Sequence, residues 1–355
     1  MKITSRVAVA VAAAFVLVAA TTASMLPDRP AVQSMPVPDT QVRAIDVQDD
    51  LIPSRRETPP PPPPPAPKPK PKPKPAAPAR DLTPYKGLGA WVDLYDYAIR
   101  DKIDPASTVD ELARRGVKTL YLQTSRFKEP ADIVNPEAVN IFLERSHAKG
   151  MKVVAWYVPG FGDMARDLRR SLLAINYVSP NGHRFDGFSP DIESREEVAG
   201  DRQRFNAGIS EYSRLLREAV PRDTVLAATV VDAKNNERAP ARWEGFPWKD
   251  IARYYDVVLS MAYWTVTKKE SNCDAQYDVA SYMKEVVSKT EALMGTSKPI
   301  HPIGGIADCT SPAEVAAYVS SIRAMGALGG SLYDFQTTQS NPSRDQIWAE
   351  LSKLN

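Results

Sequence analysis

The sequence predicts a (β/α)8 barrel, or TIM barrel, preceded by a Pro-rich stalk without regular structure. From residue 86 onward, apolar strand-like segments alternate with amphipathic helix-like segments eight times in about 270 residues, which is typical of this barrel. No Gly-x-Gly-x-x-Gly motif follows the first strand segment, which disfavours a doubly wound nucleotide-binding sheet. The composition also changes near residue 80, from Pro-rich to ordinary globular sequence. Together these features predict an α/β domain at residues 81–355.

The predicted strands are short apolar segments, and each is followed by polar or aromatic residues. They cover residues 87–95, 119–123, 153–158, 185–192, 225–231, 257–263, 300–306 and 330–335. The predicted helices cover residues 109–115, 136–148, 163–174, 202–220, 247–254, 279–293, 312–325 and 344–354. Start signals for helices one, two and seven are Ser107-Thr108, Asn135-Pro136 and Ser311-Pro312. Stop signals are Gly116, Gly150, Gly295 and Gly326.

The chain begins with a segment that predicts export. Lys2 and Arg6 precede an uncharged run at residues 7–20, and small residues that could support cleavage follow at 21–24. Counted through to Leu26, the apolar stretch has about the ~20 residues that a membrane span needs. Residues 1–26 are therefore a signal peptide or an uncleaved membrane anchor. In both cases we expect the barrel outside the cytoplasmic membrane, secreted or in the cell envelope.

Residues 27–80 predict a disordered linker rich in Pro and Lys. Seven consecutive prolines at residues 59–65 are followed by alternating Pro and Lys. Such a tract favours an extended polyproline II conformation, and at ~3.1 Å per residue the segment 59–79 would reach on the order of 65 Å. We interpret it as a spacer that carries the barrel through or away from the envelope. The alternative is a plain solvated linker.

Charge, cysteine and histidine content limit the classes of partner. The first eighty residues hold 11 of the 45 Lys and Arg and 6 of the 43 Asp and Glu, so the remainder is slightly acidic, and nucleic acid is not expected as a partner. Cys273 and Cys309 are the only cysteines, and in an exported protein they predict a disulfide. Three scattered histidines, His147, His183 and His301, predict no metal site. We expect a monomer without a cofactor.

The fourth predicted strand ends in two carboxylates. Asp191 and Glu193 are two residues apart, so on a strand their side chains face the same way, with Ser189 behind them. Two neighbouring acids repel each other, and this raises the pKa of one of them. A proton held to unusually high pH suits a general acid near neutrality. The alternative is a solvated, acidic strand end.

Carboxylates and aromatic rings gather at the predicted carboxyl ends of the strands, where barrel enzymes carry their chemistry. The catalytic candidates are Glu193, Asp191, Tyr263 and Asp334. The substrate-binding candidates are Trp91, Asp93, Gln123, Trp156, Tyr157, Asp232, Trp264 and Gln336. Some have alternatives: Trp91 and Trp156 could be core residues and Asp232 a helix cap. Arg126, which follows the second predicted strand, could be an ion-pair partner.

The segment 186–193 carries a resemblance to a known family. Asp186-Gly-Phe-Ser189-Pro-Asp191-Ile-Glu193 resembles the D-G-x-D-x-D-x-E signature of chitinase-like enzymes, glycoside hydrolase family 18, and residues 260–264 look like that family's M-x-Y-D segment. The resemblance implies a TIM barrel in which Glu193 protonates the glycosidic oxygen. It also implies that Asp191 orients a substrate acetamido group and that Tyr263 donates a hydrogen bond to that group.

Two positions depart from the family pattern. Ser189 stands where the family has its middle Asp, and Trp264 stands where it has an Asp after Tyr263. Both departures disfavour N-acetylhexosamine as the substrate. The globular part is also similar to exported actinobacterial barrels described as glycoside hydrolases without an assigned reaction.

Two function classes follow from the sequence. The first is an exported O-glycosyl hydrolase that acts on a cell-envelope or extracellular polysaccharide, with Glu193 as general acid. The second catalytic group, which acts as nucleophile or base, is either the substrate's acetamide held by Asp191 or a carboxylate such as Asp334 or Asp93. The alternative is a non-catalytic glycan-binding barrel displayed on a polyproline stalk. A third possibility is a structural envelope protein, whose barrel would show no deep pocket at this rim.

Overall fold

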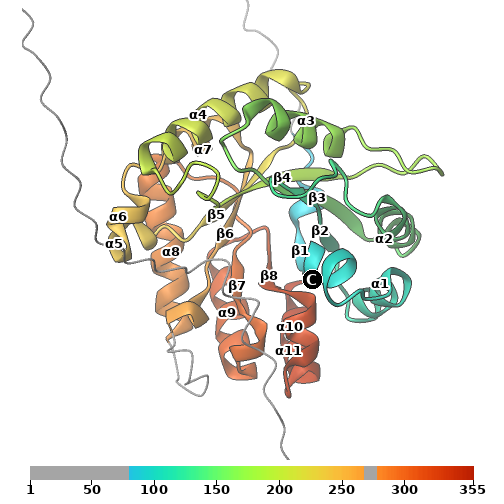
Figure 1. Ribbon diagram of the computed structural model, residues 1–355. Helices are drawn as coiled ribbons and strands as arrows, with labels where there is room; N and C mark the ends of the chain where they lie inside the picture. The colour runs from blue at the N-terminus through green and yellow to red at the C-terminus, as the bar shows by residue number, and fades with distance from the viewer. Residues whose placement is uncertain (1–79, 268–277) are drawn as a thin grey trace, which may run out of the picture. The chain divides into compact units, whose positions relative to one another are not determined.

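The computed structural model describes residues 80–267 and 278–355. Within these residues, eight parallel strands close into a barrel in chain order from β1 to β8, and helices surround it (Figure 1). The predicted (β/α)8 barrel is therefore confirmed. The predicted leader at residues 1–26, and the linker up to residue 79, lie outside the described residues.

Each strand is short and almost fully buried, as expected for a parallel sheet covered by helices. The strands are β1 Gly87–Val92, β2 Thr119–Arg126, β3 Lys152–Val158, β4 Gly187–Ile192, β5 Ala227–Val231, β6 Val257–Met261, β7 Ile303–Ile306 and β8 Gly329–Tyr333. The first and last strands end earlier than predicted. Asp93 and Asp334 therefore lie just after β1 and β8 rather than within them.

Eight of the helices correspond to the predicted ones. They are α1 Pro105–Arg114, α2 Pro136–Ala148, α3 Met164–Ile175, α4 Arg202–Ala219, α7 Trp248–Tyr254, α8 Val279–Met294, α9 Pro312–Ala324 and α11 Arg344–Leu351. Three short helices were not predicted: α5 Asn235–Arg238, α6 Pro240–Trp243 and α10 Phe335–Ser340. Helices of 4 to 6 residues are too short to show a helical period. None of the helices in the described part of the chain is long and apolar enough to cross a bilayer.

Two of the three predicted helix starts agree with the observed N-caps, and the third differs. The side chains of Asn135 and Ser311 accept hydrogen bonds from the first turns of α2 and α9, as predicted. The first helix, however, begins before Ser107. Its N-cap is Asp104, whose carboxylate accepts the backbone N–H of Ser107 at 2.8 Å. Pro105 fits the first helical position because its missing N–H would have no partner there.

Aromatic rings fill the interior of the barrel. Trp91 stacks on Tyr121 with ring centroids 4.4 Å apart, and Trp156 packs edge-on against Trp91 at 5.5 Å. The indole N–H of Trp91 donates to Ser331 Oγ at 2.8 Å. Ser331 Oγ also lies 3.1 Å from His301 Nε2, and burial lowers the pKa of this histidine to about 4. His301 therefore belongs to the core of the barrel.

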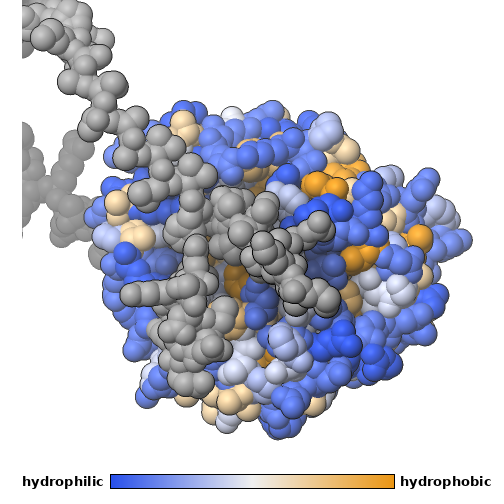
Figure 2. Space-filling model, turned by 60° about the horizontal axis from the view of Figure 1, so that its bottom comes forward, coloured by the Kyte–Doolittle hydropathy of each residue, from blue (hydrophilic) through white to orange (hydrophobic). Residues whose placement is uncertain are grey.

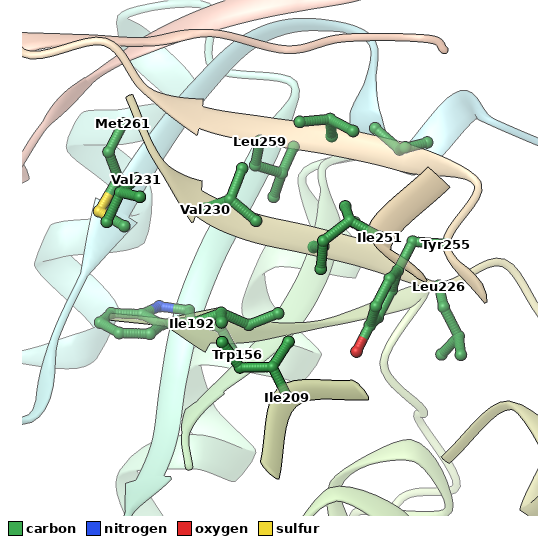
Figure 3. Close-up of a cluster of buried hydrophobic side chains, with 14 of the residues drawn as sticks. Trp156, Ile192, Ile209, Leu226, Val230, Val231, Ile251, Tyr255, Leu259 and Met261 are labelled. Carbon is green, nitrogen blue, oxygen red and sulfur yellow. The ribbon is translucent and has the colours of Figure 1, made fainter. Parts of the chain in front are cut away.

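A second layer of the core lies between the strands and their helices. Figure 3 shows part of it, in which side chains of β4, β5 and β6 meet Ile209 of α4 and Ile251 of α7. Val230 and Leu259 are among the fully buried members. This layer fixes the directions of β4 and β6, whose ends carry the predicted catalytic residues.

The predicted disulfide involves one described and one undescribed cysteine. Cys309 ends the short 3-10 helix η4 (Ala307–Cys309), directly after β7. Cys273 lies outside the described residues, so the Cys273–Cys309 pairing stays a prediction. The face of the molecule in Figure 2 is mostly hydrophilic where it is coloured, with small hydrophobic patches.

Candidate functional site

The candidate site begins at the carboxyl end of β4. Asp191 is paired in register with Thr229 of β5, and its side chain is only 7% exposed. Ser189, two residues earlier, lies with its hydroxyl 2.9 Å from the hydroxyl of Thr229. Asp191 Oδ1 is buried and has no hydrogen-bond partner among the described residues. A buried carboxylate oxygen without a donor is costly to ionise.

Glu193 follows the strand by one residue and is exposed at the rim. Loss of hydration raises the pKa of its carboxyl group, while the charge of Arg242 opposes this shift. Burial also raises the pKa of Asp191 well above its usual range, and the charge of Glu193 adds to that effect. The pair therefore holds a proton at higher pH than ordinary carboxylates do.

Tyr263 lies close to this pair. It follows β6 and is partly exposed. Burial raises the pKa of its hydroxyl, and the charges of Asp191, Glu193 and Asp334 raise it further. The hydroxyl therefore stays protonated and can donate a hydrogen bond.

A second group of carboxylates lies at the ends of β1 and β8. Oxygen atoms of Asp93, Asp96 and Asp334 all lie within 4.8 Å of one another. Asp93 Oδ1 accepts the backbone N–H of Asp96 at 3.0 Å, and Asp93 Oδ2 accepts the hydroxyl of Tyr333 at 2.8 Å. All three carboxyl groups are buried. Among the described residues, these three carboxylates form the group of metal-ligating residue types whose ligand atoms lie close enough together to hold a metal ion.

Burial raises the pKa of all three acids, and repulsion from neighbouring carboxylates adds to the shift of Asp96 and Asp334. Burial, with the charges of Asp334 and Asp93, raises the pKa of Asp96 to about 10. Burial and the charge of Asp93 raise the pKa of Asp334 to about 7. Asp334 also accepts the N–H of Thr337 at 2.8 Å, as the N-cap of α10. The ring of Tyr333 lies 6.0 Å from that of Tyr263 and thereby links the two carboxylate groups.

Three tryptophans predicted to bind substrate lie in the core instead. Trp91, Trp156 and Trp264 are 1%, 2% and 0% exposed. The first two fill the barrel interior, which was the alternative interpretation. Trp264 packs against Tyr318 with ring centroids 5.4 Å apart. The sequence could not show this, because ring burial depends on neighbours from distant strands.

Other predicted substrate ligands are already engaged by protein groups. The Tyr157 hydroxyl donates to Asp167 of α3 at 2.6 Å, so this ring faces the helix layer. Gln123 Oε1 accepts the backbone N–H of Leu94 at 2.9 Å. Both side chains are buried. Their role as sugar ligands stays a prediction.

Asp232 is also engaged by protein groups, and Gln336 lies in a groove. The carboxylate of Asp232 accepts the backbone N–H of Lys234 at 2.7 Å and pairs with Arg238 at 2.6 Å. Gln336 lines an open groove of about 490 Å³ between α1 and α10. Arg126 pairs with Glu129 at 2.6 Å, as its alternative interpretation proposed.

The residues brought together at the rim are therefore Asp191, Glu193 and Tyr263, with Asp93 and Asp334 near Tyr333. Sequence reasoning missed the contribution of Arg242, which lies on α6 and acts on Glu193. No motif marks this arginine, because the short helix that carries it was not predicted.

Comparisons with known proteins show the fold. No family model matches this sequence, and a comparison with curated protein sequences finds no match. The barrel is similar to an endo-1,4-beta-mannanase from Rhizomucor miehei, with TM-score 0.58 and 9% identity over 78% of this chain and 96% of that one.

It is also similar to a chitinase from Bacteroides thetaiotaomicron, with TM-score 0.54 and 12% identity over 76% of this chain and 96% of that one. A family GH18 chitinase from Cycas revoluta, solved with allosamidin, gives TM-score 0.54 and 12% identity over 75% of this chain and 98% of that one. The similarity to actinobacterial barrels stays a prediction. At these identities the chain shares the TIM-barrel fold of chitinases and mannanases.

Proposed function

We propose that this protein is an exported glycoside hydrolase that acts on a cell-envelope or extracellular polysaccharide. One observation carries the proposal: an exposed carboxyl, Glu193, stands beside the buried carboxyl of Asp191 at the end of β4, and both pKa values are raised. Glycosidic cleavage needs an acid that is still protonated near neutral pH. The fold shared with chitinases and mannanases supports the same class.

In the proposed mechanism, Glu193 donates its proton to the glycosidic oxygen as the bond to the leaving sugar breaks. Asp191 lies behind it with one unpartnered oxygen, which can accept a hydrogen bond from a substrate N–H or O–H. Tyr263 can donate its hydroxyl proton to a substrate oxygen. These roles agree with those implied by the chitinase-like motif.

The group that stabilises the positive charge of the sugar has two candidates. One is the substrate's own acetamide, held by Asp191. The other is a carboxylate of the second group, Asp93 or Asp334, which would act as nucleophile or base. The hydroxyl of Ser189 is hydrogen-bonded to that of Thr229, and Ser189 brings no charge beside Asp191. The residue after Tyr263 is the buried Trp264, which leaves no carboxylate there.

Replacing Glu193 by Gln tests the proposal. Glu193→Gln keeps size and hydrogen-bonding reach but removes the transferable proton. We expect the hydrolysis rate of an unactivated polysaccharide to fall roughly 10²–10⁴-fold, the usual contribution of a positioned acid. The measurement is release of reducing sugar from a panel of wall polysaccharides.

The matched control is Glu196→Gln on the same loop. Glu196 is exposed and pairs with Lys128, a surface contact of small energy. We expect this variant to retain the wild-type rate within about twofold. An active preparation that keeps its full rate with Glu193→Gln would exclude this acid.

The alternative function is a glycan-binding barrel without catalysis. The specific observation that favours it is Ser189, which replaces a carboxylate of the chitinase-like motif. Binding of a polysaccharide by the wild-type protein, with no cleavage of any polymer in the panel, would support this alternative.

The same proposal includes export by residues 1–26, display on the linker and the Cys273–Cys309 disulfide. The expected location is the outer side of the cytoplasmic membrane, free or anchored. Fractionation of cells, with mass analysis of the protein under non-reducing conditions, checks both points. A cytoplasmic protein with two free thiols would contradict them.

A further inference from the structure

A cluster of polar side chains lies at the amino end of β4, the opposite end from the candidate acid. Asp186 directly precedes this strand and opens the segment 186–193 that resembles the chitinase-like motif. Its Oδ1 accepts a hydrogen bond from Lys152 Nζ at 2.8 Å, and its Oδ2 accepts the backbone N–H of Val153 at 2.9 Å. The carboxylate of Asp186 therefore joins the amino ends of β3 and β4.

Two histidines continue this cluster. His147, in the last turn of α2, has Nε2 2.8 Å from Asp186 Oδ2 and Nδ1 2.8 Å from Nδ1 of His183. His183 belongs to the connection between α3 and β4 (Figure 1). Both histidines are partly exposed, so their rings can exchange protons with solvent. Burial alone would raise the pKa of Asp186, but hydrogen bonds from His147, Lys152 and a backbone N–H hold it below its usual range.

The positions of the protons on the two rings follow from this arrangement. An ionised carboxylate only accepts hydrogen bonds, so His147 carries a proton on Nε2. In the neutral ring its Nδ1 is then a bare acceptor, and His183 donates to it from Nδ1. The ring centroids are 5.1 Å apart, which exceeds the Nδ1–Nδ1 distance by about two ring radii, so the two nitrogens point straight at each other. This direction fits a shared proton, whereas a metal ion would need lone pairs that converge beside the line between the nitrogens.

Two added protons act differently on this contact. The first can be held by either ring, because the other ring still offers a bare Nδ1 that accepts the hydrogen bond. The second puts an N–H on both facing nitrogens, so the hydrogen bond is lost and two positive rings stand in contact. Separated rings can take up both protons freely. The contact is therefore weakened as the pH falls, because the separated state binds more protons.

Charged groups surround the pair on several elements. Asp186 and Lys152 lie on the side of His147, as described above. On the other side, hydrogen bonds from Ser179 and Asn181 lower the pKa of Glu144, and the charge of His183 lowers it further. The remaining charged neighbours have other partners: Arg145 and Lys149 pair with Asp110, and Arg184 donates to the backbone oxygen of Asn176. Because the two Nδ1 atoms are only 2.8 Å apart, none of these groups can reach between them to replace the lost acceptor.

The histidine pair fastens a turn within the connection between α3 and β4. The N–H of Ser179 donates to the backbone oxygen of His183 at 2.9 Å, and the N–H of Gly182 donates to that of Ser179 at 2.9 Å. Asn181 Nδ2 donates to Glu144 Oε2 of α2 at 2.7 Å. Asn181 and Gly182 are exposed. The tip of the turn is thus held by polar contacts, and the pair attaches its carboxyl end to α2.

We propose that His147 and His183 form an acid-sensitive clamp, which holds the turn at residues 179–183 against α2 in neutral solution and releases it when both rings are protonated. Histidine is the side chain that ordinarily titrates between about pH 5 and pH 8, so the clamp responds to mild acid. The inference does not depend on the proposed function, because the clamp lies at the end of β4 away from Glu193.

The test is hydrogen–deuterium exchange of the full-length protein, followed by mass spectrometry at about pH 7.5 and about pH 5 and corrected for the intrinsic pH dependence of exchange. We expect the protection of residues 177–185 in the wild type to be about tenfold lower, or less, at the acidic pH. This is the effect of losing one charge-assisted hydrogen bond.

His183→Asn assigns the effect to the pair. An Asn amide can donate to the neutral ring of His147 or accept from the charged ring, and it does not titrate. We expect the protection in this variant to change by less than about twofold between the two pH values. The control is Asn181→Ala, which removes the contact with Glu144 and keeps both histidines. It should lower the protection at both pH values and retain the acid response.

Two results would overturn the inference. One is equal protection of residues 177–185 in the wild type at both pH values, and the other is an acid response that persists in folded His183→Asn. Thermal unfolding shows whether each variant is folded. If His183→Asn does not fold, ¹⁵N NMR of the wild-type histidines decides: protection should be lost with the second proton that the pair takes up, and loss with the first would overturn the clamp.

Discussion

At the scale of single residues, the rim carries several carboxyl groups whose pKa values are raised. Asp191 and Glu193 lie on one side, and Asp93, Asp96 and Asp334 on the other. Burial is the largest cause of the raised pKa in every one of them. A raised pKa means that the folded protein binds the proton more tightly than the unfolded chain. The free energy of unfolding therefore falls as the pH rises through this range.

Asp96 gives a measurable case of this pH dependence. Its pKa rises from 3.8 to about 10 on folding, so wild-type stability should decline as the pH increases between these values. Asp96→Asn removes the ionisation and should raise Tm at about pH 8 by at least about 2 °C. Near pH 4 the difference should shrink. Thermal unfolding at both pH values measures it.

The control for Asp96→Asn has the opposite sign. The hydrogen bond from Arg100 holds the pKa of Asp101 below its usual range, so this carboxylate stabilises the fold above its unfolded pKa. Asp101→Asn should lower Tm slightly at about pH 8. A Tm decrease of equal size for Asp96→Asn at both pH values would contradict the expected titration.

At the scale of elements, local signals begin and end the helices around the barrel. In α9, the N–H of Glu314 donates to Ser311 Oγ at 3.3 Å, and the N–H of Ser311 donates to Glu314 Oε2 at 3.0 Å. This reciprocal pair satisfies two backbone donors that the helix itself cannot satisfy. Pro312 occupies the first helical position. The start of α9 is thus encoded within four consecutive residues.

Removing this cap should be measurable by chemical denaturation. Ser311→Ala leaves the N–H of Glu314 without its acceptor, and we expect a loss of about 1 kcal/mol in the free energy of unfolding. The control is Ser320→Ala, an exposed position in α9 where Ala is a better helix former than Ser. That change should be neutral or slightly stabilising. Equal effects of the two substitutions would contradict the role of the cap.

At the scale of the whole molecule, closure of the barrel joins distant parts of the chain. β1 pairs with β8, and Gly87 stands opposite Gly329. A Cβ atom on Gly329 would lie 2.1 Å from the backbone oxygen of Gly87 and 2.6 Å from its backbone nitrogen. The two strands can approach this closely only because Gly329 has no side chain. The same closure brings Asp93 near Asp334.

Gly329→Ala should therefore damage the fold severely. We expect a loss of more than about 4 kcal/mol or a failure to give soluble protein, because the clash is with backbone and cannot relax by a rotamer change. The control is Gly182→Ala, which has φ +84° and open space around the added atom. It should cost only about 1 kcal/mol. A Gly329→Ala protein that melts at the wild-type Tm would show that β1 and β8 can separate without loss.

The sequence by itself determined the barrel, the N-caps of α2 and α9 and the approach of Asp191 to Glu193. These follow from local rules: strand and helix periods, capping residues, and the two-residue repeat of a strand. Tertiary structure alone decided that Trp91, Trp156 and Trp264 are core residues. It also decided that Asp93, Asp96 and Asp334 form one group. The physical reason is that burial and charge pairing depend on atoms contributed by segments far away in the chain, and local patterns carry no record of them.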